Sequence, residues 1–161
     1  MLRPLGIIAP GILFGIALAY AFECSITRTS TGQRITIIVG STCAYLAAIV
    51  AALLSARLPG FDNGILYGTY VGAIAGGVGA AIVASILAII IPTLAPLPTL
   101  LIVTTAGVIF GAAFTFCGIY ISDYTPFGHP ADDFVSFALW QTGVASAIAF
   151  CNRASDFDNA K

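Results

Sequence analysis

Between Gly68 and Ala88 of this 161-residue chain, every fourth residue is glycine or alanine, and a second row of small residues runs beside the first. Residues four apart lie on one face of an α-helix, so the two rows together form a strip with almost no side chain. The first row is Gly68, Gly72, Gly76, Ala80, Ala84 and Ala88, and the second is Thr69, Ala73, Gly77, Ala81 and Ser85. The opposite face is bulky and carries Tyr70, Ile74, Val78, Ile82, Ile86 and Ile90. Such a helix is suited to the close approach of a second backbone.

The composition of the chain places this helix in a bilayer. Hydrophobic residues make up 59% of the sequence and charged residues only 8%, whereas soluble domains carry roughly 25% charged residues. The mean hydropathy is +1.02. Six basic and seven acidic residues give a formal net charge of −1, and no polybasic patch is available to attract nucleic acid or anionic lipid. We therefore predict an integral membrane protein with no nucleic-acid partner.

Five segments have the character of membrane-spanning helices, which need about 20 mainly apolar residues. They are residues 5–24, 35–56, 65–91, 99–121 and 134–151. The last is short, so four spans followed by an interfacial helix is the alternative. The remaining segments read as a polar loop, a stiff link and a polar tail: residues 25–34, the stretch with Pro92, Pro96 and Pro98, and residues 152–161. The predicted fold is all-α: one membrane domain over residues 1–161, a bundle of about five transmembrane helices packed through small-residue (GxxxG-type) faces.

Small-residue rows recur on the second and fourth predicted helices. The second helix has Gly40, Ala44, Ala48, Ala52 and Ala56 at four-residue spacing, and the fourth has Gly107, Gly111 and Thr115. A short turn makes the second and third helices an antiparallel hairpin, so we expect their strips to face each other or a common neighbour. The residues predicted to form helix-packing or partner interfaces are Gly68, Gly72, Gly76, Ala80, Ala84, Gly40, Ala44, Ala48, Gly107 and Gly111.

Residues able to carry out chemistry are missing from the predicted spans. Their central portions contain no Asp, Glu, Lys, Arg or His, although Gln141 lies near the middle of the last helix. A proton relay or an intramembrane ion site would need such groups. His129 is the only histidine and the four cysteines form no CxxC pair, so neither a catalytic set nor a metal site can be assembled. The chain is predicted not to be an enzyme and to need no cofactor or metal, with bound lipid as its one expected ligand.

An ordered set of residues crosses the turn between the second and third predicted helices. It comprises an aromatic residue, an Arg and an Asp, then glycines four apart: Tyr45, Arg57, Asp62, Asn63, Gly68 and Gly72. This order resembles the mitochondrial inner-membrane family of preprotein translocase channel-type proteins, which includes an accessory subunit of respiratory complex I. The Asn-to-Gly spacings fit that family. The aromatic-to-Arg and Arg-to-Asp gaps are each one residue longer, the Asp-to-Gly gap is shorter, and Thr42 stands where the family has Gly or Ala.

The resemblance implies a lipid-embedded accessory subunit or a translocase component, without a specific activity. It covers only the stretch from Tyr45 to Gly72, and similar glycine-rich helices occur in small prokaryotic multi-pass proteins of unknown function. The location implied is the mitochondrial inner membrane or the prokaryotic cytoplasmic membrane, and the sequence does not distinguish them.

Three function hypotheses fit these patterns. The first is a non-catalytic membrane subunit with a structural or accessory role in a larger membrane protein complex, bound to other subunits, to lipid or to a second copy of itself. The alternative is a small transporter or channel for an uncharged or weakly polar solute, built as a dimer with inverted repeats. Its support is the similarity of residues 11–18 to residues 107–114. The third is a quinone- or lipid-binding module in a groove near Trp140, Phe114 and Phe116.

Overall fold

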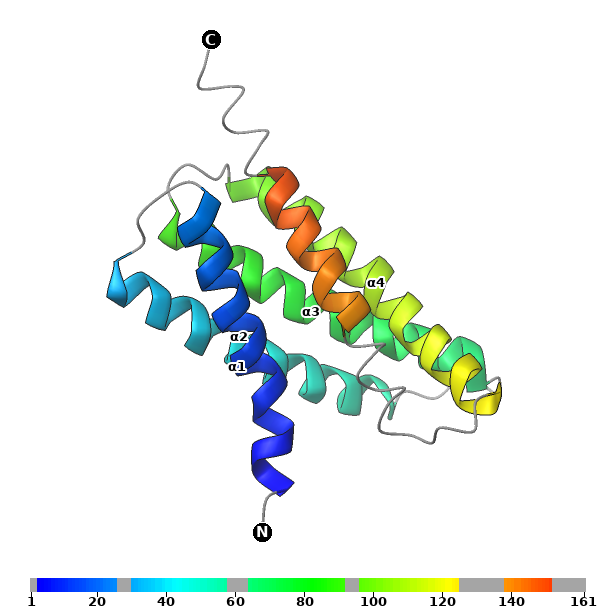
Figure 1. The fold of residues 1–161 in the computed structure, drawn as a ribbon. Helices are drawn as coiled ribbons and strands as arrows, with labels where there is room; N and C mark the ends of the chain where they lie inside the picture. The colour runs from blue at the N-terminus through cyan, green and yellow to red at the C-terminus, as the bar shows by residue number, and fades with distance from the viewer. Residues whose placement is uncertain (1–2, 26–29, 58–63, 92–95, 125–137, 152–161) are drawn as a thin grey trace.

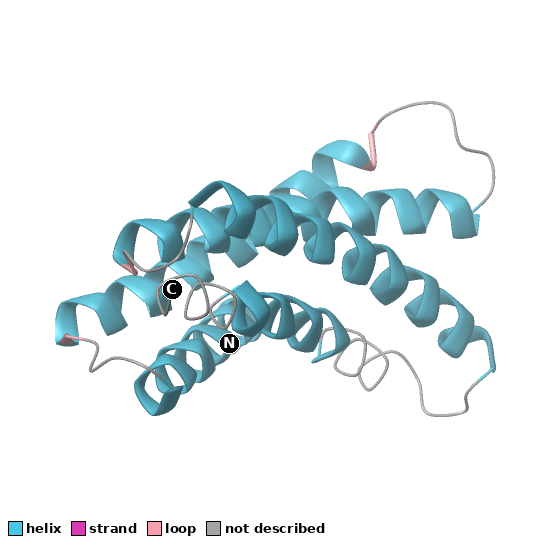
Figure 2. Ribbon diagram, turned by 90° about the horizontal axis from the view of Figure 1, so that it is seen from above, coloured by secondary structure: helices cyan, strands magenta, loops and turns pink. Residues whose placement is uncertain are grey.

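The computed structural model describes residues 3–25, 30–57, 64–91, 96–124 and 138–151. In these segments all regular structure is helical (Figure 2). The four long helices are α1 (Arg3–Ser25), α2 (Thr31–Ser55), α3 (Gly64–Ile90) and α4 (Pro96–Tyr124). A fifth, here called the C-terminal helix, spans Ala138–Cys151 and is the orange and red helix of Figure 1. The prediction of an all-α chain with five helices is confirmed.

Three of the helices are long and apolar enough to cross a membrane. They are α2, the Leu66–Ile90 part of α3 and the Pro96–Phe116 part of α4. The helix α1 and the C-terminal helix carry the further apolar stretches Ile8–Glu23 and Ala138–Cys151. The structure thus supports a multi-pass membrane protein, with three candidate spans among the described residues.

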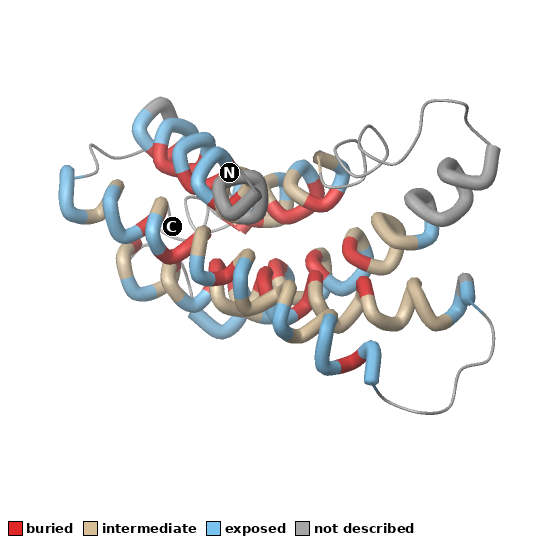
Figure 3. Tube along the Cα trace, turned by 90° about the horizontal axis from the view of Figure 1, so that it is seen from below, coloured by how far each residue is buried: buried red, intermediate tan, exposed pale blue. Residues whose placement is uncertain are grey.

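The helix α3 lies at the centre of the bundle. Within its apolar stretch 39% of the residues are buried, against 22% in α2 and in α4. It packs against α4 most extensively and against α2 on its other side, and α1 packs on α2. The buried positions turn toward the space between the helices, and the exposed positions run along the outside (Figure 3). The small-residue strip therefore belongs to the helix with the largest buried share.

The helix α2 begins at Thr31, so the prediction of a loop through Arg34 is wrong. Ser30 is the N-cap, and its side chain accepts a hydrogen bond from the Gln33 amide at 3.3 Å. The Gln33 side chain in turn accepts one from the Ser30 amide at 2.8 Å. This capping box satisfies two backbone donors that a helix start leaves unpaired. Polar residues that suggested a loop are those that begin the helix.

The helix α4 begins at Pro96, so the prediction that Pro96 and Pro98 form a link ahead of the helix is wrong as well. Amides in the first helical turn have no intrahelical acceptor, and proline, which lacks the amide hydrogen, loses nothing there. Pro10 lies inside α1. The other helix ends lie within about three residues of the predicted ones, except that the predicted start of the last helix, residue 134, falls outside the described residues.

Three polar contacts join the helix ends. Gln33 Nε2 at the start of α2 donates to the Ile90 carbonyl at the end of α3 at 3.1 Å. Arg34 pairs with Glu23 of α1 at 2.7 Å, and the Tyr67 hydroxyl of α3 donates to the Ala56 carbonyl that follows α2. The first and third contacts lie at opposite ends of α2 and fix its antiparallel register against α3.

Candidate functional site: a glycine interface and an apolar cavity

The backbones of α3 and α4 are in direct contact at four glycines, here called the glycine interface: Gly72, Gly76, Gly107 and Gly111. A Cβ atom built on Gly76 would lie 2.2 Å from the Gly107 carbonyl oxygen and 2.8 Å from the Gly111 Cα. A Cβ on Gly111 would lie 2.3 Å from the Gly72 carbonyl oxygen. No side chain fits at such distances, so the helices approach this closely only because all four positions are glycine.

The rest of the α3 strip continues along the same contact. Ala80 is fully buried, and its methyl group lies where a Cβ on Gly107 would come within 2.2 Å. Ala84 is also fully buried, and Gly68, at the other end of the strip, is half-buried. Gly77 in the second row faces Val108, whose Cγ2 would be 2.7 Å from an added Cβ. The strip predicted from the sequence therefore packs on α4 from Gly72 to Ala80.

The strip of α2 does not face the strip of α3. A Cβ on Gly40 would meet the Ile86 side chain at 2.5 Å, and Ala48 approaches Gly79, where an added Cβ would lie 3.2 Å from its methyl group. Ala44, which is also buried, places its carbonyl oxygen beside Gly79. The small face of α2 thus receives a large side chain of α3 at one point and a further glycine at another.

The glycines of α1 and of the C-terminal helix are also in contact within the chain. An added Cβ on Gly15 would lie 2.6 Å from the Ile38 Cα, and one on Gly11 would lie 3.0 Å from the Thr42 Cα. One on Gly143 would lie 2.2 Å from the Phe110 ring. The C-terminal helix therefore packs on α4, and α1 packs on α2 through its glycines.

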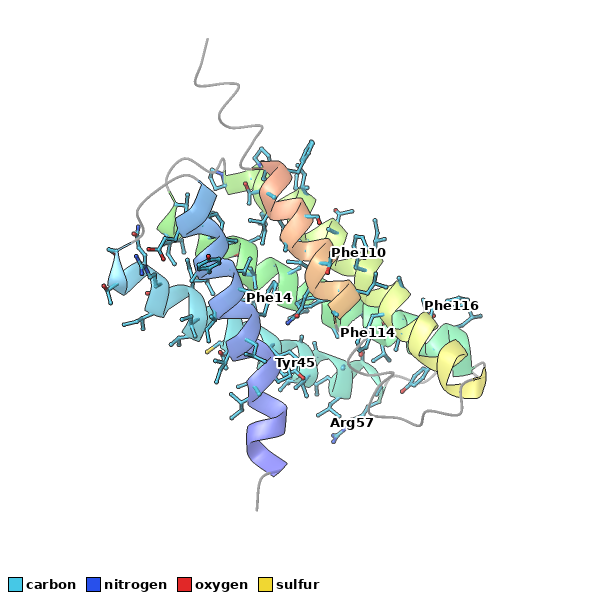
Figure 4. The ribbon with its side chains drawn as sticks, in the orientation of Figure 1. Phe14, Tyr45, Arg57, Phe110, Phe114 and Phe116 are labelled. Carbon is cyan, nitrogen blue, oxygen red and sulfur yellow. The ribbon has the colours of Figure 1, made fainter. Side chains whose placement is uncertain are left out.

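An apolar cavity of about 250 Å³ lies where α2, α3, α4 and the C-terminal helix meet, and it is partly open to the outside. Its lining is small or aromatic apart from two aliphatic residues: Tyr45, Ala48, Ile49, Ala52, Val71, Gly72, Ala75, Gly76, Gly111, Phe114, Thr115 and Trp140. Tyr45 and Phe114 mark it in Figure 4, on α2 and α4 respectively. Three glycines of the glycine interface form part of this wall.

Trp140 lines the cavity from the C-terminal helix. Its indole lies beside Gly76 and Gly79, and its ring centroid is 5.8 Å from that of Phe14 in α1. Only 6% of its surface is exposed. Next to it, Gln141 Nε2 donates to the Pro10 carbonyl at 3.4 Å. Trp140 therefore contacts two other helices from the C-terminal helix.

The cavity offers binding but no evident chemistry. The Thr115 hydroxyl is already bonded to the Gly111 carbonyl at 2.9 Å, and the lining contains no Asp, Glu, His, Lys, Arg or Cys. Among the described residues no group of His, Cys, Asp or Glu could hold a metal ion. The predicted loop histidine, His129, lies outside the described residues. What the cavity can hold is a slender apolar group.

Several residues of this site were not among those predicted from the sequence, including Ile49, Val71, Ala75 and Gly79. Gly79 has a signal, because it follows Gly72 and Gly76 at helical spacing and turns the α3 strip partly toward α2. The sequence predicts a role for Trp140 only as part of a lipid- or quinone-binding groove. The tight contacts of Gly76 and Gly79 with its indole could not be read from spacing.

The comparisons with known proteins add nothing to these contacts. No family model, curated protein or solved structure matches the chain. The resemblance to the translocase channel-type family therefore stays a prediction from the residues of this chain that are named above. Of these, Tyr45 lines the cavity, Gly72 lies in the glycine interface and Arg57 lies at the end of α2 (Figure 4). Asp62 and Asn63 fall outside the described residues.

Proposed function

We propose that this chain is a non-catalytic, multi-pass integral membrane subunit with a structural or accessory role in a larger membrane protein complex. The observation that carries the proposal is the exposure of large apolar side chains on the outer surface. Large apolar residues face outward from every helix, with exposed fractions of 64% for Leu13, 53% for Val50 and 81% for Ile89. Water would penalise such a surface, whereas lipid and the apolar faces of other membrane subunits accept it.

The glycine contacts favour this role over an inverted-repeat transporter. If residues 107–114 repeated residues 11–18, Gly107 and Gly111 would pack on the C-terminal helix as Gly11 and Gly15 pack on α2. Instead they pack on α3. The similarity of the two segments therefore has no counterpart in the contacts they make, and a glycine-rich, apolar membrane composition explains it.

Site-specific photo-crosslinking in native membranes tests the proposal. A photoreactive residue at outward-facing Leu13 or Ile89 is expected to yield a discrete crosslinked product containing a different membrane protein. The same probe at Val83, which is only 2% exposed, serves as the control and should react only within the chain.

Two results would contradict the accessory role. The first is reaction of both outward positions with lipid alone. The second is a product that contains only a second copy of this chain, together with flux of a small uncharged solute in vesicles. The latter would support the transporter alternative.

A further inference from the structure

The cavity beside the glycine interface needs an apolar occupant. An empty cavity forfeits the dispersion contacts of the atoms that line it, and a water molecule needs two to four polar partners to be stable inside a protein. Thr115 already uses its hydroxyl within α4, and the other walls are mostly hydrocarbon. An apolar cavity of roughly 150 Å³ suffices for benzene, so 250 Å³ accepts a longer hydrocarbon segment.

The position of the cavity along α2 matches the depth of one lipid leaflet. Its α2 wall runs from Ala52 to Tyr45, which is about 10 Å at the helical rise per residue. Arg57 follows at the end of α2, about 18 Å along the axis from Tyr45. The hydrocarbon half of a bilayer is about 15 Å thick. A chain that starts at the level of Arg57 and passes Ala52 would therefore end near Tyr45 and Trp140.

The charge of Arg57, beyond the outer end of the cavity wall, favours an anionic headgroup. Arg57 is exposed, and the one ion pair among the described residues joins Arg34 to Glu23. The planar guanidinium of Arg57 suits bidentate bonding to a phosphate group. Arg57 lies at the end of α2 beyond Tyr45 (Figure 4). The cavity wall on α2 extends from Tyr45 to Ala52, in the direction of Arg57.

We propose that the cavity holds one acyl chain of an anionic phospholipid whose phosphate pairs with Arg57. The proposal rests on the membrane location proposed above. The lipid chain fills the space left by Gly72, Gly76 and Ala75 on α3, and its end contacts the indole of Trp140. The lipid is thus a bound component of the bundle with a defined site, distinct from the solvating lipid around the outer surface.

Fluorescence of Trp140 tests the site, because it is the only tryptophan of the chain and is buried from bulk lipid. The protein is reconstituted in phosphatidylcholine vesicles that contain a minor fraction of phosphatidylglycerol carrying bromine, a short-range quencher, near the end of one acyl chain. The expected result is loss of most of the Trp140 emission. Bromine near the carbonyl end of the chain should quench much less.

Cavity-filling variants provide the controls. Ala52→Phe and the milder Ala75→Leu both occupy the cavity and should restore most of the emission, whereas Ala17→Phe, on the exposed face of α1, should leave the quenching unchanged. Circular dichroism checks that each variant retains its helices. Unquenched emission from the parent protein in these vesicles, or equal quenching in the filled variants, would overturn the acyl-chain site.

The headgroup assignment has its own readout. Brominated phosphatidylglycerol should quench at a lower fraction of total lipid than brominated phosphatidylcholine, and Arg57→Gln should abolish that difference. Equal quenching by the two lipids in the parent protein would overturn the pairing with Arg57. Flotation with the vesicles separates these outcomes from a failure of the proposed function: a chain that does not float with them is not an integral membrane protein.

Discussion

Replacing Gly76 by alanine is the sharpest perturbation of the glycine interface. The added Cβ would lie 2.2 Å from the Gly107 carbonyl oxygen, whereas ordinary van der Waals contact begins at 3.4 Å. The helices α3 and α4 must therefore move apart by more than an ångström at this point. Neither obstacle can rotate away, because both Gly107 and Gly111 contribute backbone atoms.

The expected cost follows from two opposing effects. Overpacking of a filled interior costs up to about 3 kcal/mol, and the upper value applies because the clash is with backbone. Alanine is favoured over glycine within a helix by about 1 kcal/mol. The net loss in the free energy of unfolding is then about 2 kcal/mol, which corresponds to a fall in Tm of roughly 4–8 °C for a chain of this size.

The assay is thermal unfolding in mild detergent, followed by circular dichroism. Gly64→Ala is the matched control on the same helix, because a Cβ there would meet nothing within 4 Å, and its Tm should not fall below that of the parent. A Gly76→Ala protein that melts with the parent would refute the reasoning, since α3 and α4 could not then be in backbone contact at this residue.

Three other contacts give further predictions. Gly40→Ala should lower Tm, and Ile86→Val in the same chain should recover part of the loss, because the clash is with the Ile86 Cδ1 at 2.5 Å; additive effects in a double-mutant cycle would contradict this contact. Ser30→Ala should cost about 1 kcal/mol through loss of the capping box, and an unchanged Tm would mean that the box does not form. Arg34→Gln removes an exposed pair with Glu23 and should cost less than about 1 kcal/mol, with a difference that high salt abolishes; a salt-independent loss would contradict an exposed pair.

The sequence predicted which backbone surfaces are bare but not which ones meet. The periodicity of Gly72, Gly76 and Ala80 reports only that a neighbour comes close, and α2 and α4 both carry a matching row. The structure pairs this strip with α4 and gives α2 the face with Gly79 and Ile86. Which arrangement forms depends on how side-chain volumes interlock across both contacts at once, and a single helix does not contain that information.

The two incorrect helix starts have a different cause, because the signals were present. Ser30 and Gln33 have the spacing of a capping box, and Pro96 is a residue type favoured in the first helical turn. The predicted loop and the predicted link follow from the average tendency of these residue types to break helices. At a helix start the polar side chains accept hydrogen bonds from backbone amides that would otherwise be unpaired. A proline there has no amide hydrogen to leave unpaired.

The cavity could not have been predicted from any one strip, because it is formed by several of them together. Gly72, Gly76 and Gly111 bring α3 and α4 into contact and at the same time leave no side chain to fill the space toward α2. On the α2 side, Ala48 and Ala52 add little volume. The close contact of α3 and α4 thus leaves a gap beside it, and the bound acyl chain proposed above would fill this gap. It follows that stripping lipid should destabilise the parent more than the Ala75→Leu variant, in which a side chain takes the place of the lipid.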